Sequence, residues 1–372
     1  MKNFLYLLLV SGVLFLGCNS YNPPPKPDLT TQIDKTPKNI IFMIGDGMGI
    51  SQITAGMYAN GNKLNLERIK SIGLHKSYAS DNLVTDSAAG ATAFATGVKT
   101  YNGAIGVNPD TVAVPTILEN LKKEGYATGL IATSTIVHAT PASFFAHVKS
   151  RKMYEEIAEA FLEETVDFFV GGGLKFFTSR EKDDRNLIEE LEAKGYQMSS
   201  YFEEDFNKVE INKSKKFGYL TANKDPLTVE QGRKYLTPAT ENAIDFLKNK
   251  SEKGFFLMIE GAQIDWGGHA NNTNYIINEM IDFDNAIGKV LDYVEKDGET
   301  LLVITADHET GGFALNTGST MDTIKGAFTS DYHTAALIPV FAKGPGEELF
   351  KGIYENTAIY DKMNKLVSSR MP

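Results

Sequence analysis

Residues 39–49 read NIIFMIGDGMG, an apolar run rich in isoleucine that ends in a glycine-rich turn containing one carboxylate. A short apolar run bounded by glycine is typical of a strand buried on both faces of a parallel sheet. We therefore expect a strand over Asn39–Ile44, after which the glycines let the backbone bend tightly around Asp46. In open α/β sheets, ligands bind beyond the carboxyl ends of the strands. Asp46 is thus the first candidate for a functional residue.

Similar runs alternate with helical patterns along the rest of the chain. The further expected strands are Ala127–Thr133, Val166–Val170, Phe255–Glu260, Thr300–Thr305 and Ala336–Phe341. The expected helices are Pro115–Glu124, Asp184–Lys194, Thr237–Lys248 and Asn274–Lys296. This alternation predicts a three-layer α/β fold, with a mostly parallel sheet between two helical layers. The more polar and less regular stretch Ser179–Lys224 is expected to be an inserted excursion near the substrate.

Residues 84–97 read VTDSAAGATAFATG and place one hydroxyl, that of Ser87, between the carboxylate of Asp86 and a ladder of small residues. Small side chains allow a helix to pack closely on a sheet. The free N–H groups and the dipole at the start of such a helix favour an oxyanion or phosphate beside Ser87. A serine at a helix start is more often only a structural cap. This pattern alone therefore leaves a nucleophile and a cap both open.

Polar residues with metal-binding chemistry lie at the ends of several expected strands. His138, Thr140, Glu260, Asp265, His269, Asp307 and His308 lie at or after the carboxyl end of a strand, and His333 lies just before the last one. Asp307 and His308 are neighbours, so both can contact one ion only if the strand has already ended before them. Asp265 and His269 are four residues apart, which places them on one face of a helix or in a tight loop. Carboxylate and imidazole groups suit zinc, and hard oxygen ligands suit magnesium. Each residue alone is more often structural, but so many at strand ends indicate a metal site.

The chain has 372 residues and a formal net charge of −10, and Lys and Arg are not clustered. This composition argues against general nucleic-acid binding, which depends on clustered basic residues. The apolar stretch Phe4–Leu16 is too short for a stable membrane span and suits a signal-peptide core.

The sequence Leu16-Gly17-Cys18 resembles a lipoprotein signal box, with Cys18 as the lipidated residue. We expect a signal peptide over 1–17, a lipidated proline-rich tether over 18–38, and a single catalytic domain over 39–372. The protein would then be exported and attached to a membrane through Cys18, facing the periplasm or the cell surface.

Six segments, taken together and in order, resemble the motifs of the alkaline phosphatase family: Phe42–Gly49, Thr85–Gly106, His138–Lys152, Glu260–His269, Thr305–Glu309 and His333. The resemblance implies the fold of that family and a metal-dependent phosphomonoesterase with a covalent phosphoserine intermediate. It also implies a homodimer and, by analogy, a role in phosphate scavenging.

The resemblance assigns a role to each matching residue. Ser87 would be the nucleophile, Arg151 would clamp the phosphoryl oxygens, and Asp86 would orient Arg151. Two Zn²⁺ and one Mg²⁺ are implied. The first zinc would be held by Asp265, His269 and His333, the second by Asp46, Asp307 and His308 with Ser87, and the magnesium by Asp46, Thr140 and Glu260.

Two residues depart from the pattern of some bacterial members. His138 stands where these have Asp, and Trp266 where they have Lys, so the third metal stays open and Trp266 is expected to be a pocket wall. We expect His75 and His147 to be structural, the latter on a helix.

Two alternatives remain. One is a phosphodiesterase, sulfatase or phosphomutase of the same superfamily. The other is a non-catalytic lipoprotein that binds metal or phosphate. The Asp-Ser-Ala setting of Ser87 and the downstream Arg151 favour the monoesterase.

Overall fold

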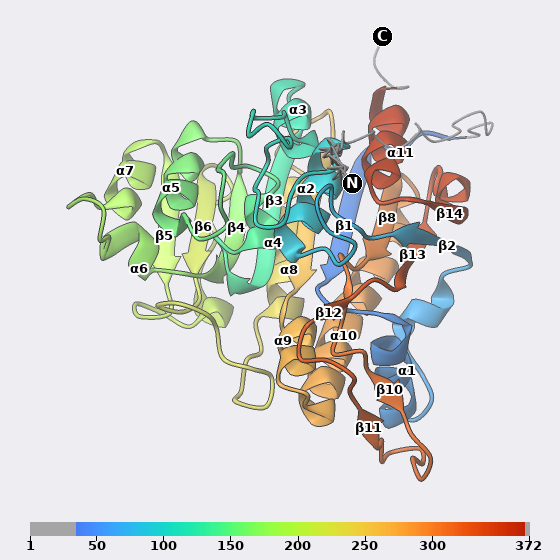
Figure 1. The fold of residues 1–372 in the computed structure, drawn as a ribbon. Helices are drawn as coiled ribbons and strands as arrows, with labels where there is room; N and C mark the ends of the chain where they lie inside the picture. The colour runs from blue at the N-terminus through green and yellow to red at the C-terminus, as the bar shows by residue number, and fades with distance from the viewer. Residues whose placement is uncertain (1–34, 369–372) are drawn as a thin grey trace, which may run out of the picture.

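The computed structural model describes residues 35–368, in which ten strands form one sheet between layers of helices (Figure 1). The strand order is β14-β2-β13-β8-β1-β7-β3-β4-β6-β5. Only β13 runs antiparallel to its neighbours β2 and β8, and the other pairs in this sheet are parallel. The three-layer, mostly parallel α/β fold expected from the sequence is confirmed. The strands are β1 Asn39–Gly45, β2 Ser71–Lys76, β3 Ala127–Thr135, β4 Phe168–Gly172, β5 Tyr196–Ser200, β6 Lys216–Leu220, β7 Phe255–Gly261, β8 Thr300–Thr305, β13 Leu337–Lys343 and β14 Gly352–Glu355.

Two small ribbons lie outside this sheet. One pairs β9 (Glu309–Thr310) with β12 (His333–Thr334), and the other pairs β10 (Ala314–Leu315) with β11 (Gly326–Ala327). The first ribbon matters for function, because it joins the segment after β8 to the segment that carries His333.

Helices cover both faces of the sheet, and the four expected from the sequence are among them, each within a few residues of its expected bounds. The helices are α1 Ile50–Ala59, α2 Ser87–Thr96, α3 Ile117–Lys123, α4 Ala139–Ala142, α5 Tyr154–Glu159, α6 Lys175–Thr178, α7 Leu187–Ala193, α8 Leu236–Leu247, α9 Gln263–His269, α10 Thr273–Asp297 and α11 Thr357–Ser368. A capping box between Thr116 and Glu119 starts α3. Gly298, at a φ of 70°, ends α10 in the left-handed conformation that glycine adopts without steric cost.

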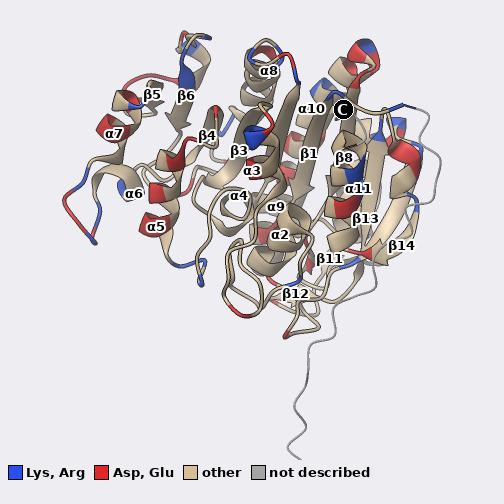
Figure 2. Cartoon of the chain, turned by 90° about the horizontal axis from the view of Figure 1, so that it is seen from above, with Lys and Arg blue, Asp and Glu red and all other residues tan. Residues whose placement is uncertain are grey.

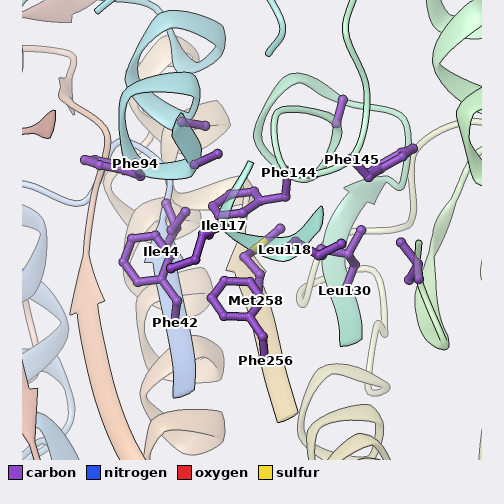
Figure 3. Packing of buried hydrophobic residues seen from close by; sticks show 14 of the residues in the cluster. Phe42, Ile44, Phe94, Ile117, Leu118, Leu130, Phe144, Phe145, Phe256 and Met258 are labelled. Carbon is purple, nitrogen blue, oxygen red and sulfur yellow. The ribbon is translucent and has the colours of Figure 1, made fainter. Parts of the chain in front are cut away.

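The central strand β1 separates two hydrophobic cores, because successive side chains of a strand point to opposite faces. Phe42 and Ile44 belong to the core on the α2 and α3 side, which Figure 3 shows with Phe94 of α2 packed above them. Ile41 and Met43 belong to the opposite core, with α8 and α10. Burial on both faces fixes β1 and therefore the position of Asp46 at its end.

Two expectations are wrong. The stretch Ser179–Lys224 is no irregular excursion, since it contains α7, β5 and β6 and completes one edge of the sheet, away from β1. His147 lies outside any helix: its Nδ1 contacts the Gly106 carbonyl at 2.6 Å and its Nε2 contacts Glu119 at 3.0 Å. His147 is a structural residue nonetheless. His75 is also structural, as it is buried with Nε2 2.8 Å from the Ala306 carbonyl.

Acidic and basic residues both occur on the outer helix α11, whereas the charged residues of α7 are all acidic (Figure 2). Between residues 35 and 368, no helix is both long and apolar enough to cross a membrane. The expected signal peptide, Cys18 and the tether up to residue 34 lie outside the described residues.

Candidate metal and phosphate site

The strand ends that carry the candidate residues lie side by side, because β8, β1, β7 and β3 are neighbours in the sheet. Asp46 follows β1, Glu260 lies at the end of β7, and His138 and Thr140 follow β3. β8 ends at Thr305, before Asp307 and His308. These two neighbours can therefore both contact one ion. Helix α2 lies against the central strands, and α9 and β12 lie beyond their carboxyl ends (Figure 1).

Ser87 is the first residue of α2, and it is not the cap. Asp86 is the cap residue, since its Oδ1 accepts a hydrogen bond from Ala89 N at 3.0 Å. The Ser87 hydroxyl instead faces Nε2 of His308 at 3.4 Å and is buried, with 2% of the residue exposed. The alternative that Ser87 is a structural cap is therefore wrong, and the Ser87 hydroxyl is available for other chemistry.

The second of the two expected zinc clusters lies beside Ser87, which contacts its His308. Nε2 of His308 lies 3.3 Å from Asp307 Oδ2 and 3.5 Å from Asp46 Oδ1. All three residues are fully buried, and both Asp46 oxygens and Asp307 Oδ2 lack a hydrogen-bond partner among the described residues. Buried carboxylate oxygens need a partner. Ligand atoms in a tetrahedral zinc site lie about 3.3 Å apart, so these groups fit a divalent cation.

The first expected zinc cluster combines α9 with β12. Asp265 and His269 lie one turn apart on α9, with His269 Nε2 3.4 Å from Asp265 Oδ2. Nε2 of His333 lies 3.2 Å from Nε2 of His269 and 3.6 Å from Asp265 Oδ1. Two imidazole nitrogens that face each other at this distance need a proton or a cation between them. This triangle also has the dimensions of a tetrahedral metal site.

The other ring nitrogen of each histidine has a partner that fixes the ring. Nδ1 of His269 lies 2.7 Å from the Asp331 carbonyl, and Nδ1 of His333 lies 2.8 Å from the Thr85 carbonyl. Because a carbonyl only accepts, each Nδ1 carries the hydrogen and each Nε2 is left for a metal when the ring is neutral.

Thr310 likewise fixes the ring of His308 so that its Nε2 is left for a metal. Its hydroxyl lies 2.5 Å from Asp265 Oδ1 and 3.2 Å from His308 Nδ1, so it donates to the carboxylate and accepts from the ring. No sequence pattern predicts this bridge between the two clusters. Its only signal is the position of Thr310 two residues beyond His308.

A third group joins Asp46 with His138 and Glu260, whose ligand atoms lie within 4.8 Å of one another. Burial raises the pKa of Glu260, and the nearby hydroxyls of Thr140 and Ser134 oppose that rise; Ser134 Oγ donates to Glu260 Oε2 at 3.0 Å. Thr140 therefore belongs to the surroundings of this group, as expected. Asp46 is shared with the Asp307–His308 cluster.

The electrostatics of the site favour cations. Burial, and then the carboxylates of Asp307, Asp265 and Glu260, raise the pKa of Asp46 well above its ordinary value. Burial also lowers the pKa values of His308 and His333 to about 4 each, which keeps the imidazoles in the neutral form that binds metals. The site thus holds excess negative charge that divalent cations would compensate.

Arg151 lies beside these clusters. Its Nη1 donates to Asp86 Oδ2 at 3.0 Å and its Nη2 approaches Nε2 of His138 at 3.3 Å. The ring of Trp266, half-buried on α9, meets His138 edge to face, with centroids 6.1 Å apart. The contact between Asp86 and Arg151 is the one expected, and the structure adds contacts of His138 with Arg151 and with Trp266.

A buried serine beside clustered carboxylates and imidazoles, at the carboxyl edge of a parallel sheet, defines a metal-dependent α/β enzyme. The family model for alkaline phosphatase matches residues 37–327. The chain belongs to the alkaline phosphatase family and is an enzyme of that family.

Its relatives include alkaline phosphatase 3 of Bacillus subtilis, 41% identical over 75% of this chain and 62% of that protein, which is less than two thirds of the relative's length. The alkaline phosphatase of Escherichia coli is 35% identical over 89% of this chain and 86% of that protein. Among solved structures, the alkaline phosphatase of the Antarctic bacterium TAB5 matches with a TM-score of 0.85 and 47% identity, over 91% of this chain and 99% of that one. A variant of the TAB5 enzyme has Mg bound in its M3 site. Family and clusters together support bound divalent metals.

Proposed function

We propose that this enzyme hydrolyses phosphate monoesters to an alcohol and inorganic phosphate through a covalent phosphoserine at Ser87. The observation that carries this proposal is the position of the Ser87 hydroxyl. It is free of any capping role, is buried, and lies 3.4 Å from a nitrogen of the Asp46–Asp307–His308 cluster.

Three metal sites follow from the clusters. Asp265, His269 and His333 would hold one zinc, and Asp46, Asp307 and His308 with Ser87 would hold the other. Asp46, Thr140 and Glu260 would hold magnesium, with His138 beside it. When bound, these cations would lower the pKa of the serine hydroxyl and offset the charge on the departing oxygen.

The chain's own residues account for the rest of the reaction. The Ser87 oxygen forms a bond to phosphorus while the bond from phosphorus to the ester oxygen breaks, and the alcohol leaves. Water then attacks phosphorus, the bond to Ser87 breaks, and phosphate is released with the serine regenerated. Arg151 can donate two parallel hydrogen bonds to phosphoryl oxygens, and Asp86 orients it.

Charge favours a monoester over a diester. The positive charge of three divalent cations and Arg151 would exceed the negative charge of the four carboxylates, those of Asp46, Glu260, Asp265 and Asp307. A dianionic monoester balances this excess better than a monoanionic diester or sulfate ester. Phosphate scavenging by an exported protein anchored through Cys18 is the physiological role we propose.

The test is phosphate release from an aryl phosphate at alkaline pH. We expect activity that chelation abolishes and that zinc with magnesium restores. The matched variant Ser87→Ala should lose hydrolysis by several orders of magnitude while it still binds inorganic phosphate. If this variant hydrolyses at the wild-type rate, the serine pathway is wrong; if the wild type is inactive in every metal state, the proposal of a monoesterase is wrong.

A further inference from the structure

Glu309, in β9, is a buried carboxylate next to the metal clusters that the proposed reaction does not use. Only 6% of the residue is exposed, and among the described residues it forms no ion pair with Lys, Arg or His. Burying a charge without a partner is strongly unfavourable. The interactions that compensate this charge should therefore show what Glu309 holds in place.

Four neutral donors surround the Glu309 carboxylate. Oε1 accepts from Gln52 Nε2 at 2.8 Å and from Phe313 N at 3.0 Å. Oε2 accepts from Gly312 N at 3.2 Å and from the hydroxyl of Thr334. These donors lie on three separate segments: helix α1, the turn after β9, and strand β12. One side chain therefore ties three segments together.

Each of these segments positions a part of the site. Helix α1 follows the Asp46 loop, and Gln52 Nε2 also donates to the Thr310 carbonyl at 2.8 Å. Thr334 is adjacent to His333, and β12 pairs with β9 so that His333 lies opposite Thr310. The space for the carboxylate depends on Gly49, where a Cβ would lie 2.5 Å from Glu309 Cγ.

We propose that Glu309 is a positioning residue that holds His333 in place, so that Asp265, His269 and His333 present one compact set of ligands to a divalent cation. The inference rests on the metal sites of the proposed function. Because His333 is also held through the Thr85 carbonyl, loss of the Glu309 contacts should weaken the cluster without removing it.

The test is zinc affinity, measured by competition with a chromophoric chelator, in Glu309→Gln. This variant keeps the shape of the side chain but turns an NH₂ group toward donors. We expect affinity at one zinc site to fall about 10- to 100-fold, the range for loss of an outer partner of a ligand, and excess zinc to restore kcat. The matched control is Glu347→Gln, because Glu347 accepts from Ser71 Oγ at 2.8 Å and Gly344 N at 2.7 Å without any link to the clusters.

A second pair of variants keeps the test informative if Glu309→Gln does not fold. Thr334→Val removes the hydroxyl donor, and Thr334→Ser keeps it. We expect the first to lower zinc affinity and the second to bind zinc as the wild type does. Wild-type affinity in Glu309→Gln or Thr334→Val, or an equal loss in the Glu347 control, would overturn the positioning role. The zinc-affinity measurements need no hydrolysis, so they stay separate from the test of the proposed function.

Discussion

Asp86 and Arg151 are joined by a hydrogen bond of 3.0 Å between carboxylate Oδ2 and guanidinium Nη1, although 65 residues separate them. The other oxygen of Asp86 caps α2 through Ala89 N. One carboxylate thus fixes both the start of the helix that carries Ser87 and the orientation of the arginine beside it. Asp86 therefore fixes the position of Ser87 relative to Arg151.

Asp86→Asn should separate these two roles. Asparagine is a good N-cap, so we expect the free energy of unfolding to change by less than about 1 kcal/mol. The amide lacks the charge that pairs with Arg151, so the dissociation constant of inorganic phosphate should rise about 10-fold, which corresponds to about 1.4 kcal/mol. Isothermal titration with phosphate measures this. An unchanged phosphate affinity would mean that Arg151 is positioned without Asp86.

Removal of the metals should destabilise the fold as well as abolish activity. The carboxylates of Asp46, Glu260, Asp265 and Asp307 are all buried. A ligand present at 100 times its dissociation constant stabilises the native state by about 2.7 kcal/mol per site. At about 1–2 °C per kcal/mol for a domain of this size, chelation should lower Tm by roughly 3–5 °C per site.

Differential scanning calorimetry of Ser87→Ala tests this without turnover. His269→Ala is the control, since it removes one ligand of one cluster and should show a smaller effect of chelation. A Tm that does not respond to chelation would argue against cations in these clusters.

The small residues of α2 should be required for the approach of the helix to the metal ligands. A Cβ at Gly90 would lie 2.9 Å from the Cβ of Asp307, which is held at the site by Gly47 N. We expect Gly90→Ala to cost about 1–3 kcal/mol of stability through overpacking and to weaken the metal site that includes Asp307.

The matched control for Gly90→Ala is Gly56→Ala, another helical glycine. An added Cβ at Gly56 would lie 2.5 Å from Cγ of the flexible Met280 side chain. Along the sequence, both residues are ten or more positions from any proposed metal ligand. Both variants should change Tm, but only Gly90→Ala should lower the zinc content per chain, as measured by elemental analysis. Equal zinc content in the two variants would contradict the prediction.

Sequence patterns predict the centre of this fold better than its edges, for a physical reason. Strands such as β1 and β8 are buried on both faces and therefore read as continuous apolar runs. Strand β5 is an edge strand in which buried and half-buried residues alternate, so its apolar content does not distinguish it from a loop. The irregularity expected of Ser179–Lys224 reflects this half-burial.

Most of the candidate site could be predicted because all of its carboxylate and imidazole ligands except His333 lie at or after the ends of buried strands that the sequence itself locates. Contacts that depend on the relative placement of distant segments could not be predicted from the sequence. The Thr310 hydroxyl bridges Asp265 and His308 only because α9 and β9 meet in three dimensions. Similarly, whether Asp86 or Ser87 caps α2 depends on where the helix begins, a boundary that sequence patterns leave uncertain by a few residues.

Lys362, on α11, should make the stability of the protein depend on pH in the alkaline range. Only 4% of the residue is exposed, and Nζ lies 2.8 Å from the centroid of the Tyr354 ring. Burial lowers the pKa of Lys362 to about 7, whereas the unfolded chain keeps a value of about 10.4. Between these values the unfolded state binds more protons than the native state, so this residue's contribution to stability rises with pH.

Lys362→Met should therefore stabilise the protein most at pH 7 and below, where the wild type must bury a charge. The gain in Tm should shrink as pH rises from 7 toward 10, because the native wild type then buries a neutral amine. Comparing variant and wild type at each pH, both loaded with metal, cancels the pH dependence of the metal sites. The control Lys351→Met replaces an exposed lysine and should give a Tm difference that does not vary with pH. A gain for Lys362→Met that stays constant from pH 7 to 10 would mean that the lysine is neutral, or equally charged, in both states across that range.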